Sequence, residues 1–198
     1  MKRTIALCAL MLLLASLAWA QEPGEQPAMP SPEEMAEVMK LLQPGEHHEH
    51  MARYVGKWKA VTKMWSMPGM PPTESEGTTD IVALMDGRYY QTTLEGSFMD
   101  MPFHGMAIEG YDNLRKKHVG SWIDTMGTGI MYYEGTCSED HKVITTFAEV
   151  DDPMSGARVK MRQVTTAIDE DNFKYEAFAK NPQGEGEMKV MEVIYSRI

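Results

Sequence analysis

Residues 54–58 read Tyr54-Val55-Gly56-Lys57-Trp58 and mark the point where the hydrophobic pattern of the chain changes its period. Downstream, Ala60, Thr62 and Met64 share one face with Trp58, while lysines occupy the other face. An alternation of this kind indicates a half-buried β-strand. Because a Gly-x-Trp stands where this strand begins, we predict that it opens a closed antiparallel barrel.

The rest of the chain continues in the same period. Further strands are predicted near residues 75–84, 87–98, 103–111, 116–124, 128–136, 142–150, 157–168, 172–179 and 188–196. Turn sequences such as Pro68-Gly69 and Asp86-Gly87 separate them and leave no room for crossover helices. The sequence therefore predicts an all-β fold, a closed up-and-down antiparallel barrel of about ten strands, because closure removes both sheet edges.

The first twenty residues have the pattern of a signal peptide. Lys2 and Arg3 precede an apolar run, and Ala18-Trp19-Ala20 places small residues at the two positions that a signal peptidase reads. No other stretch approaches the roughly 18 uncharged residues that a membrane helix needs. We therefore expect an exported protein, periplasmic or extracellular, that is soluble after cleavage and has no integral membrane segment in its mature chain.

Two further segments precede the predicted barrel domain, residues 56–198. Residues 21–32 are rich in proline and polar side chains and are interpreted as a flexible linker. Residues 33–55 are interpreted as a helical segment, with Ser31 and Glu34 as a capping box at its start. A second helical turn is expected over 46–54, and we expect these helices to lie across one end of the barrel.

Composition narrows the classes of partner. The formal net charge is −10, which makes nucleic acid an unexpected partner. Removal of Cys8 with the signal peptide leaves Cys137 as the one thiol, so no intramolecular disulfide can form. The length fits one domain with a sizeable core. The sequence leaves the oligomeric state open.

Several motifs together carry a family resemblance. They are Val55-Gly56-Lys57-Trp58, Gly110-Tyr111-Asp112, Trp122–Gly129, Val159–Arg162 and Tyr195-Ser196-Arg197. Through them, nearly all of residues 46–198 resembles a family of exported bacterial proteins described as domain of unknown function 1579. The resemblance implies a lipocalin-like, or calycin, barrel in which Trp58 and Arg197 form a structural cation–π pair. The family implies no reaction, ligand or cofactor, so function must be argued from a site.

The barrel lumen is the first candidate site, because lipocalin-like barrels enclose small apolar or amphipathic molecules. The predicted lining residues are Trp58, Tyr89, Glu95, Phe103, Glu109, Tyr111, Trp122, Asp124, Tyr132 and Met161. The alternative is that such side chains simply fill a packed core. Recurrent Glu-Gly pairs favour sharp strand curvature at the glycines and a partly acidic lumen.

The second candidate is a periplasmic metal site, above all for copper. Met64, Met67 and Met70 offer thioethers, which select Cu(I), and His47, His48 and His50 offer imidazoles for Cu(II), Zn(II) or Ni(II). The alternative is that the methionines fill gaps and the histidines form a solvated helix face. Haem is not expected, because the last histidine is His141 and no late strand carries one.

The third candidate is an uncharacterised enzyme. The chain contains no Gly-x-Ser-x-Gly, His-Glu-x-x-His or phosphate-loop motif. Asp124 with Glu109 or Glu134 could form a carboxylate pair for acid–base work if their strands are neighbours. We rank this class below ligand binding, predict no catalytic residue and name no cofactor.

Overall fold

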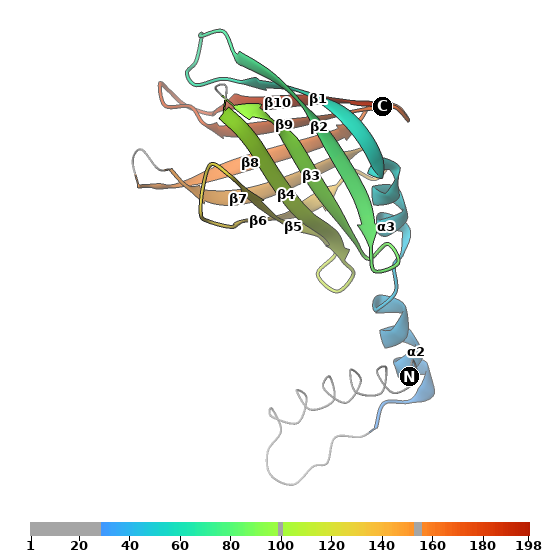
Figure 1. Cartoon of the computed structure of the whole chain (residues 1–198). Helices are drawn as coiled ribbons and strands as arrows, with labels where there is room; N and C mark the ends of the chain where they lie inside the picture. Colours follow the sequence, from blue (N-terminus) through green and yellow to red (C-terminus); the bar gives the residue numbers. More distant parts are fainter. Residues whose placement is uncertain (1–28, 99–100, 153–155) are drawn as a thin grey trace. The chain divides into compact units, whose positions relative to one another are not determined.

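Ten antiparallel strands close into one barrel in the computed structural model, which describes residues 29–98, 101–152 and 156–198 (Figure 1). Each strand pairs with the next in sequence, and β10 returns to pair with β1. The strands are β1 (Gly56–Met64), β2 (Thr73–Leu84), β3 (Tyr89–Phe98), β4 (Met101–Asp112), β5 (Lys117–Asp124), β6 (Met131–Cys137), β7 (Val143–Asp151), β8 (Arg158–Ala167), β9 (Asn172–Lys180) and β10 (Glu187–Arg197). The predicted closed up-and-down barrel is confirmed.

The alternation of side chains explains why the sheet closes. In β1, Trp58 and Ala60 are buried, while Lys57 and Lys59 are exposed. The seam between β1 and β10 runs from the pair Trp58–Arg197 to the pair Met64–Met191. Closure at this seam pairs backbone groups that an open sheet would leave unpaired at its edges. A Cβ at Gly77 would lie 2.5 Å from the carbonyl oxygen of Glu95, so glycine permits a close approach of β2 and β3 there.

Helix α2 (Pro32–Leu41) belongs almost entirely to a separate unit that ends at Lys40, and it is described by itself. The capping box predicted at its start is confirmed, because Ser31 N–H donates to Glu34 Oε2 at 2.7 Å and Glu34 N–H donates to Ser31 Oγ at 3.2 Å. None of its residues is buried. The predicted signal peptide, 1–20, and the predicted linker up to residue 28 lie outside the described residues.

None of the described helices is long and apolar enough to cross a membrane.

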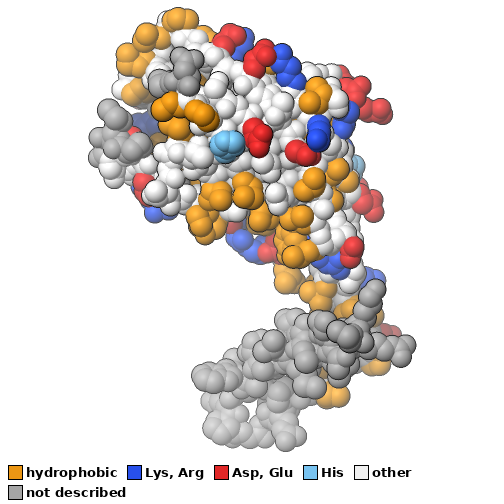
Figure 2. All heavy atoms as spheres, in the orientation of Figure 1, with side chains coloured by type: hydrophobic (Ala, Val, Ile, Leu, Met, Phe, Trp, Pro, Cys, Tyr) orange, Lys and Arg blue, Asp and Glu red, His pale blue; other side chains and the backbone are white. Residues whose placement is uncertain are grey.

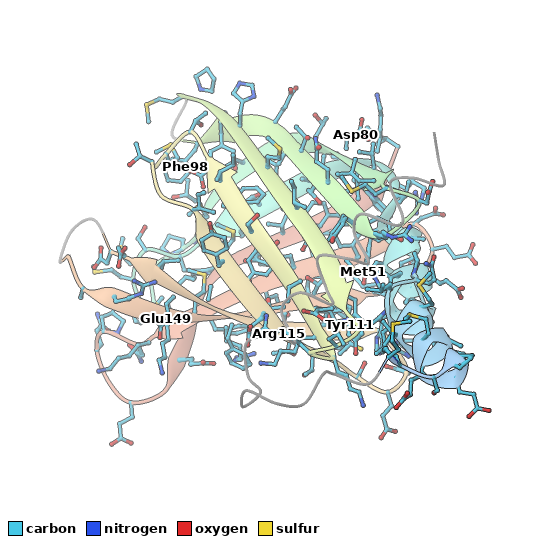
Figure 3. All side chains as sticks on the ribbon, turned by 90° about the horizontal axis from the view of Figure 1, so that it is seen from below. Met51, Asp80, Phe98, Tyr111, Arg115 and Glu149 are labelled. Carbon is cyan, nitrogen blue, oxygen red and sulfur yellow. The ribbon has the colours of Figure 1, made fainter. Side chains whose placement is uncertain are left out.

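The short helices α3 (Glu46–Met51) and η1 (Ala52–Tyr54) occupy the second predicted helical segment and precede β1. Tyr90 on β3 donates its hydroxyl to the carbonyl oxygen of His48 at 2.7 Å, inside the protein. Figure 3 shows Met51 beside Tyr111 of β4, whereas Phe98 lies at the opposite end of the barrel. We call the end covered by α3 and η1 the closed end.

The packed core lies at the closed end. It consists of Met51, Trp58, Ala60, Ile81, Tyr90, Phe173, Val193 and Tyr195. The Arg197 guanidinium lies 4.0 Å from the ring centroid of Trp58, a contact worth about 0.5–1 kcal/mol when partly exposed. Its nitrogens also donate to the carbonyl oxygens of Val55 and Arg53, both at 3.0 Å. Arg197 thereby ties the last strand to the segment that enters the first.

Candidate functional site

The inner wall of the barrel is built from one face of each strand. Most of the predicted lining residues belong to that face: Trp58, Phe103, Glu109, Tyr111, Trp122, Asp124 and Met161. Trp58 and Tyr111 lie at the closed end, within or against the packed core, whereas Asp124 is the last residue of β5 and lies at the opposite end. Phe103, near the start of β4, also lies at that opposite end, and Glu109, Trp122 and Met161 line the wall between the two ends.

Three predicted lining residues point outward instead. Tyr89 is 43% exposed, Tyr132 is 67% exposed, and Glu95 lies on the outside 4.0 Å from His104. Successive side chains of a strand point to opposite faces of the sheet. Because Tyr90 and Tyr133 point into the barrel, the residues next to them, Tyr89 and Tyr132, point outward. Tyr89, Glu95 and Tyr132 therefore cannot line the lumen.

Glu109 is the central acidic group of the lumen. Its Oε1 accepts a hydrogen bond from the Tyr133 hydroxyl at 3.0 Å, and its Oε2 accepts one from Thr92 Oγ1 at 3.4 Å. The three residues come from β4, β6 and β3, so the barrel wall itself brings them together. Burial raises the pKa of Glu109, although these two hydrogen bonds act in the opposite direction.

Three tyrosines surround this carboxyl group. Burial raises the pKa of Tyr133, Tyr175 and Tyr195, and the nearby charge of Glu109 raises each of these pKa values further. Their hydroxyls therefore remain protonated and act as hydrogen-bond donors. The arrangement is a carboxyl group set among phenol rings, a surface that is apolar with a few polar atoms.

Glycines on the inner wall make room for aromatic rings. A Cβ atom at Gly105 would overlap the indole ring of Trp122, and one at Gly120 would lie 2.5 Å from the ring of Tyr133. The rings can thus lie flat against the neighbouring strand rather than project across the lumen. Ala107, buried on the same inner face, adds another small side chain.

Several side chains of the inner face beyond the core cluster are only half-buried: Thr92, Leu94, Phe103, Glu109, Trp122, Tyr133 and Met161. Side chains in a fully packed core would be inaccessible to solvent. Solvent therefore reaches part of the inner wall beyond the core cluster.

Basic side chains are kept on the outside of the barrel. In the strands as far as the structure describes them, lysines and arginines belong to the outer face, apart from Arg197 over Trp58 at the closed end. There they form pairs such as Lys59–Glu76 at 2.9 Å and Arg162–Glu187 at 2.7 Å. Figure 2 shows acidic and basic side chains interspersed over the outer surface. Glu109 consequently has no cationic partner within the described part of the lumen.

The predicted carboxylate pairs do not form. The register places Asp124 opposite Gly105 and Glu109 opposite Gly120, four residues apart along the wall, or roughly 13 Å. Asp124 instead accepts hydrogen bonds from Trp122 Nε1 at 2.7 Å and from the Met126 N–H at 2.8 Å. Glu134 lies on the outside, where it pairs with Arg115 and Lys117.

The predicted methionine and histidine ligands lie at opposite ends of the barrel. Met64 ends β1, and Met67 and Met70 are exposed in the turn that follows, whereas the histidines belong to α3 before β1 begins. They cannot form one site. His48 is buried, and its Nδ1 accepts a hydrogen bond from the Gly45 N–H at 3.1 Å.

His47 and His50 meet residues that sequence reasoning did not place with them. Cys137 Sγ lies 3.5 Å from Nδ1 of His47 and 3.5 Å from Nδ1 of His141. The rings of His50 and His141 are stacked, with centroids 4.1 Å apart. Cys137 and His141 are four residues apart in sequence, but nothing in the sequence links them to α3. We call His47, Cys137 and His141 the Cys–His cluster.

The fold and the lumen together define a class: closed antiparallel β-barrels with a partly polar, lined interior. A family model described as "Protein of unknown function (DUF1579)" matches residues 43–197, and the chain belongs to this family. No curated protein matches the chain.

Solved structures share the barrel at low sequence identity. The crystal structure of Rv2717c from M. tuberculosis is 13% identical, covers 79% of this chain and 99% of its own, and has a TM-score of 0.57. A redesigned beta barrel is 14% identical, with 74% and 93% of the two chains covered and a TM-score of 0.38. A protein of unknown function from the DUF3598 family of Nostoc punctiforme PCC 73102 is 9% identical, with 78% and 100% covered and a TM-score of 0.24. At 13% identity, the similarity to Rv2717c supports the barrel fold and nothing beyond the fold.

Proposed function

We propose that the barrel binds a small, partly apolar molecule in its lumen, with Glu109 and Tyr133 contacting the polar group of that molecule. The observation that carries the proposal is Glu109 itself, a carboxyl group that the fold holds inside the barrel without a cationic partner among the described residues. Burying a carboxylate without a cationic partner opposes stability. A bound molecule would supply the missing polar contacts.

The surroundings of Glu109 favour one chemical class of ligand. A carboxylate repels anions, so fatty acids and phosphate esters fit poorly. A hydroxyl or amine group on an apolar body fits well, because it donates to Glu109 while the body contacts inner-wall side chains such as Trp122 and Met161. An amine would also gain from the faces of the surrounding phenol rings.

The test compares two bulky substitutions on adjacent residues of β4. Ala107 is 4% exposed and belongs to the inner face, whereas Ile108 is 45% exposed on the outer face. Ala107→Phe should displace a molecule that co-purifies with the protein, and Ile108→Phe should retain it. Native mass spectrometry of gently isolated protein, with circular dichroism as a check of folding, measures both.

Glu109→Gln tests the polar contact separately, with Glu95→Gln on the outer face as its matched control. A ligand that donates to the carboxylate should bind roughly 10-fold more weakly to Glu109→Gln, corresponding to about 1.4 kcal/mol for one charge-assisted hydrogen bond. Equal occupancy of folded wild type and Ala107→Phe would remove the lumen as the binding site. An unchanged affinity in Glu109→Gln would be consistent with binding in the lumen but would contradict the proposed contact with Glu109.

We also propose that the protein acts outside the cytoplasm, since the pattern of residues 1–20 is that of a signal peptide. Expression of the full chain in a bacterial host, followed by fractionation and measurement of the intact mass, tests this. A mass that begins at Gln21 in the exported fraction is expected. Uncleaved protein in the cytoplasm would contradict it.

A further inference from the structure

We infer that the Cys–His cluster is a binding site for a zinc-class divalent transition-metal ion, which the Cys137 thiolate and Nδ1 of His47 and His141 ligate together. The three atoms lie within 4.8 Å of one another. They come from α3, from the end of β6 and from the turn between β6 and β7. An ion there would join the helix that closes the barrel to the barrel wall.

The two sulfur–nitrogen separations in the cluster match those of an occupied site. Zinc binds sulfur at about 2.3 Å and histidine nitrogen at about 2.0–2.1 Å with tetrahedral angles, which places sulfur and nitrogen ligands about 3.5 Å apart. Both sulfur–nitrogen distances in the cluster are 3.5 Å.

Neighbouring groups hold both imidazoles in position. The ring of His47 is stacked on Tyr111, with centroids 3.8 Å apart, and the ring of His141 is stacked on His50. Glu46 Oε1 lies 3.5 Å from Nε2 of His141, the nitrogen that faces away from Cys137. Metal-bound histidines commonly direct their second N–H to a carboxylate, and this contact fixes the ring and its tautomer.

The turn that carries His141 is also well defined. Asp140 Oδ1 accepts hydrogen bonds from Ser138 Oγ at 2.6 Å and from the Lys142 N–H at 3.1 Å. His141 itself has φ 53°, in the left-handed region that a non-glycine residue adopts at a cost. The turn therefore directs the imidazole back toward Cys137 at the expense of backbone strain.

An independent observation at the same place is His118 of β5. It is 5% exposed, and neither ring nitrogen has a hydrogen-bond partner among the residues that the structure describes. Its ring lies 5.8 Å from that of His47, and with Cys137 and His141 it lines one small pocket. A buried imidazole with both nitrogens unpaired needs a group from outside the chain. His118 is not among the residues whose donor atoms lie within 4.8 Å of one another, so we assign it a contact with a water bound at the fourth coordination position rather than direct ligation.

The donor set selects the class of ion. Thiolate and imidazole are borderline-to-soft ligands that suit zinc, cobalt and copper, whereas magnesium and calcium require oxygen ligands. Binding exchanges the Cys137 S–H bond for a sulfur–metal bond and releases the proton to solvent. No electron transfer is involved. The methionines at the other end of the barrel take no part.

Cobalt is the direct probe, because a tetrahedral cobalt–thiolate site has intense visible absorption and a sulfur-to-metal charge-transfer band. Titration of metal-free protein with Co²⁺ should show saturation at one equivalent, and Zn²⁺ should abolish both signals. Cys137→Ser should lose the charge-transfer band. His141→Gln should weaken affinity more than about 100-fold, beyond the roughly 10–100-fold cost of an outer partner such as Glu46.

His104→Gln is the matched control, since His104 lies on the outer face of β4, 4.0 Å from Glu95. It should bind Co²⁺ like the wild type. Absence of a charge-transfer band in the folded wild type, or an unchanged affinity in both Cys137→Ser and His141→Gln, would overturn the proposal. Neither outcome depends on whether the lumen holds a ligand.

Discussion

At the scale of single residues, Glu109 shows how a barrel can hold a charged group at the expense of stability. Its neighbours supply two hydrogen bonds, from Tyr133 and Thr92, but no cation. Burial raises the pKa of Glu109, so the folded protein holds the proton more tightly than the unfolded chain does. Ionisation of this one residue therefore opposes folding, and the effect depends on pH.

The sign of that dependence gives the first prediction. As pH rises from about the ordinary glutamate value of 4.5 through the raised pKa, the folded state loses the advantage of binding the proton, so stability falls. Glu109→Gln removes this fall. We expect the variant to gain stability relative to wild type, on the order of 1 kcal/mol, at pH values above the raised pKa.

Thermal unfolding of ligand-free protein across a range of pH measures the difference. Glu95→Gln, a glutamate on the outside of the neighbouring strand, is the control and should follow the wild-type curve. Parallel curves for Glu109→Gln and wild type would show that the carboxyl group is not buried in solution.

The residue scale also shows where sequence reasoning failed. Glu109 was assigned to the lumen correctly, but Tyr132 was assigned there in place of Tyr133. Tyr132 and Tyr133 are adjacent and identical in type, so residue type cannot show which of the two points into the barrel. That depends on which alternate positions of the strand face inward. Gly135, buried on the inner face, could have identified these positions, because it lies two residues from Tyr133.

At the scale of elements, α3 is too short to be stable as an isolated helix, so its contacts with the barrel must hold it. One of these is the buried hydrogen bond from the Tyr90 hydroxyl to the His48 carbonyl oxygen. Asn113, in the turn after β4, donates to the carbonyl oxygens of Leu41 at 3.0 Å and Gln43 at 2.8 Å, in the segment that leads into α3. The helix position thus depends on polar contacts as well as on Met51.

Tyr90→Phe is the second prediction. It removes the hydroxyl and leaves the His48 carbonyl group buried without this partner, which should cost about 1–3 kcal/mol. Tyr89→Phe changes the adjacent, exposed tyrosine and should cost less than about 0.5 kcal/mol. Urea unfolding measures both, and hydrogen exchange of α3 amides should quicken in Tyr90→Phe alone. Equal stability of the two variants would contradict this role of Tyr90.

Metal removal is the third prediction and concerns the same helix. If one ion joins α3 to the turn after β6, free zinc at 100 times its dissociation constant should stabilise the folded protein by about 2.7 kcal/mol. A chelator should reverse the gain. His141→Gln should show neither effect, whereas His104→Gln should show both. A rise in melting temperature that is equal in His141→Gln would place the ion elsewhere.

The Cys–His cluster lay beyond sequence reasoning for a physical reason. His47 and Cys137 are 90 residues apart, and their contact depends on how α3 crosses the end of the closed barrel. The sequence predicts the histidines of α3 as metal ligands, but nothing in it links them to Cys137 or His141. Alternation within a strand can be deduced locally, whereas the docking of a short helix on a barrel end cannot.

At the scale of the whole molecule, the alternating pattern and the lack of room for crossover helices were enough to predict a closed meander, because each rests on local sequence. Closure itself joins the two ends of the barrel sequence, where β1 pairs with β10. Arg197 reinforces this seam at the closed end. Its guanidinium covers Trp58 and donates to the carbonyl oxygens of Arg53, Val55 and Glu170.

Arg197→Lys is therefore the prediction that concerns the barrel as a unit. Lysine keeps the charge but lacks the planar fork that reaches several carbonyl groups while stacking on the indole. We expect a loss of about 1–3 kcal/mol, because at least one carbonyl group loses its partner and the cation–π contact weakens. Arg158→Lys, at an exposed pair with Glu149 on the outside, is the matched change and should cost less than about 0.5 kcal/mol.

Because the barrel has no free edge, loss of this seam contact should weaken every strand together rather than fray one end. Tryptophan fluorescence, measured with Trp65 and Trp122 replaced by Phe so that Trp58 is the one tryptophan in residues 29–198, and far-ultraviolet circular dichroism, which reports on the whole sheet, should then give the same midpoint in Arg197→Lys. A fluorescence change that precedes loss of the sheet signal would instead mean that β1 and β10 separate first. In that case the contacts of Arg197 at the closed end would stabilise the β1–β10 pair alone, and the other strand pairs would persist after β1 and β10 separate.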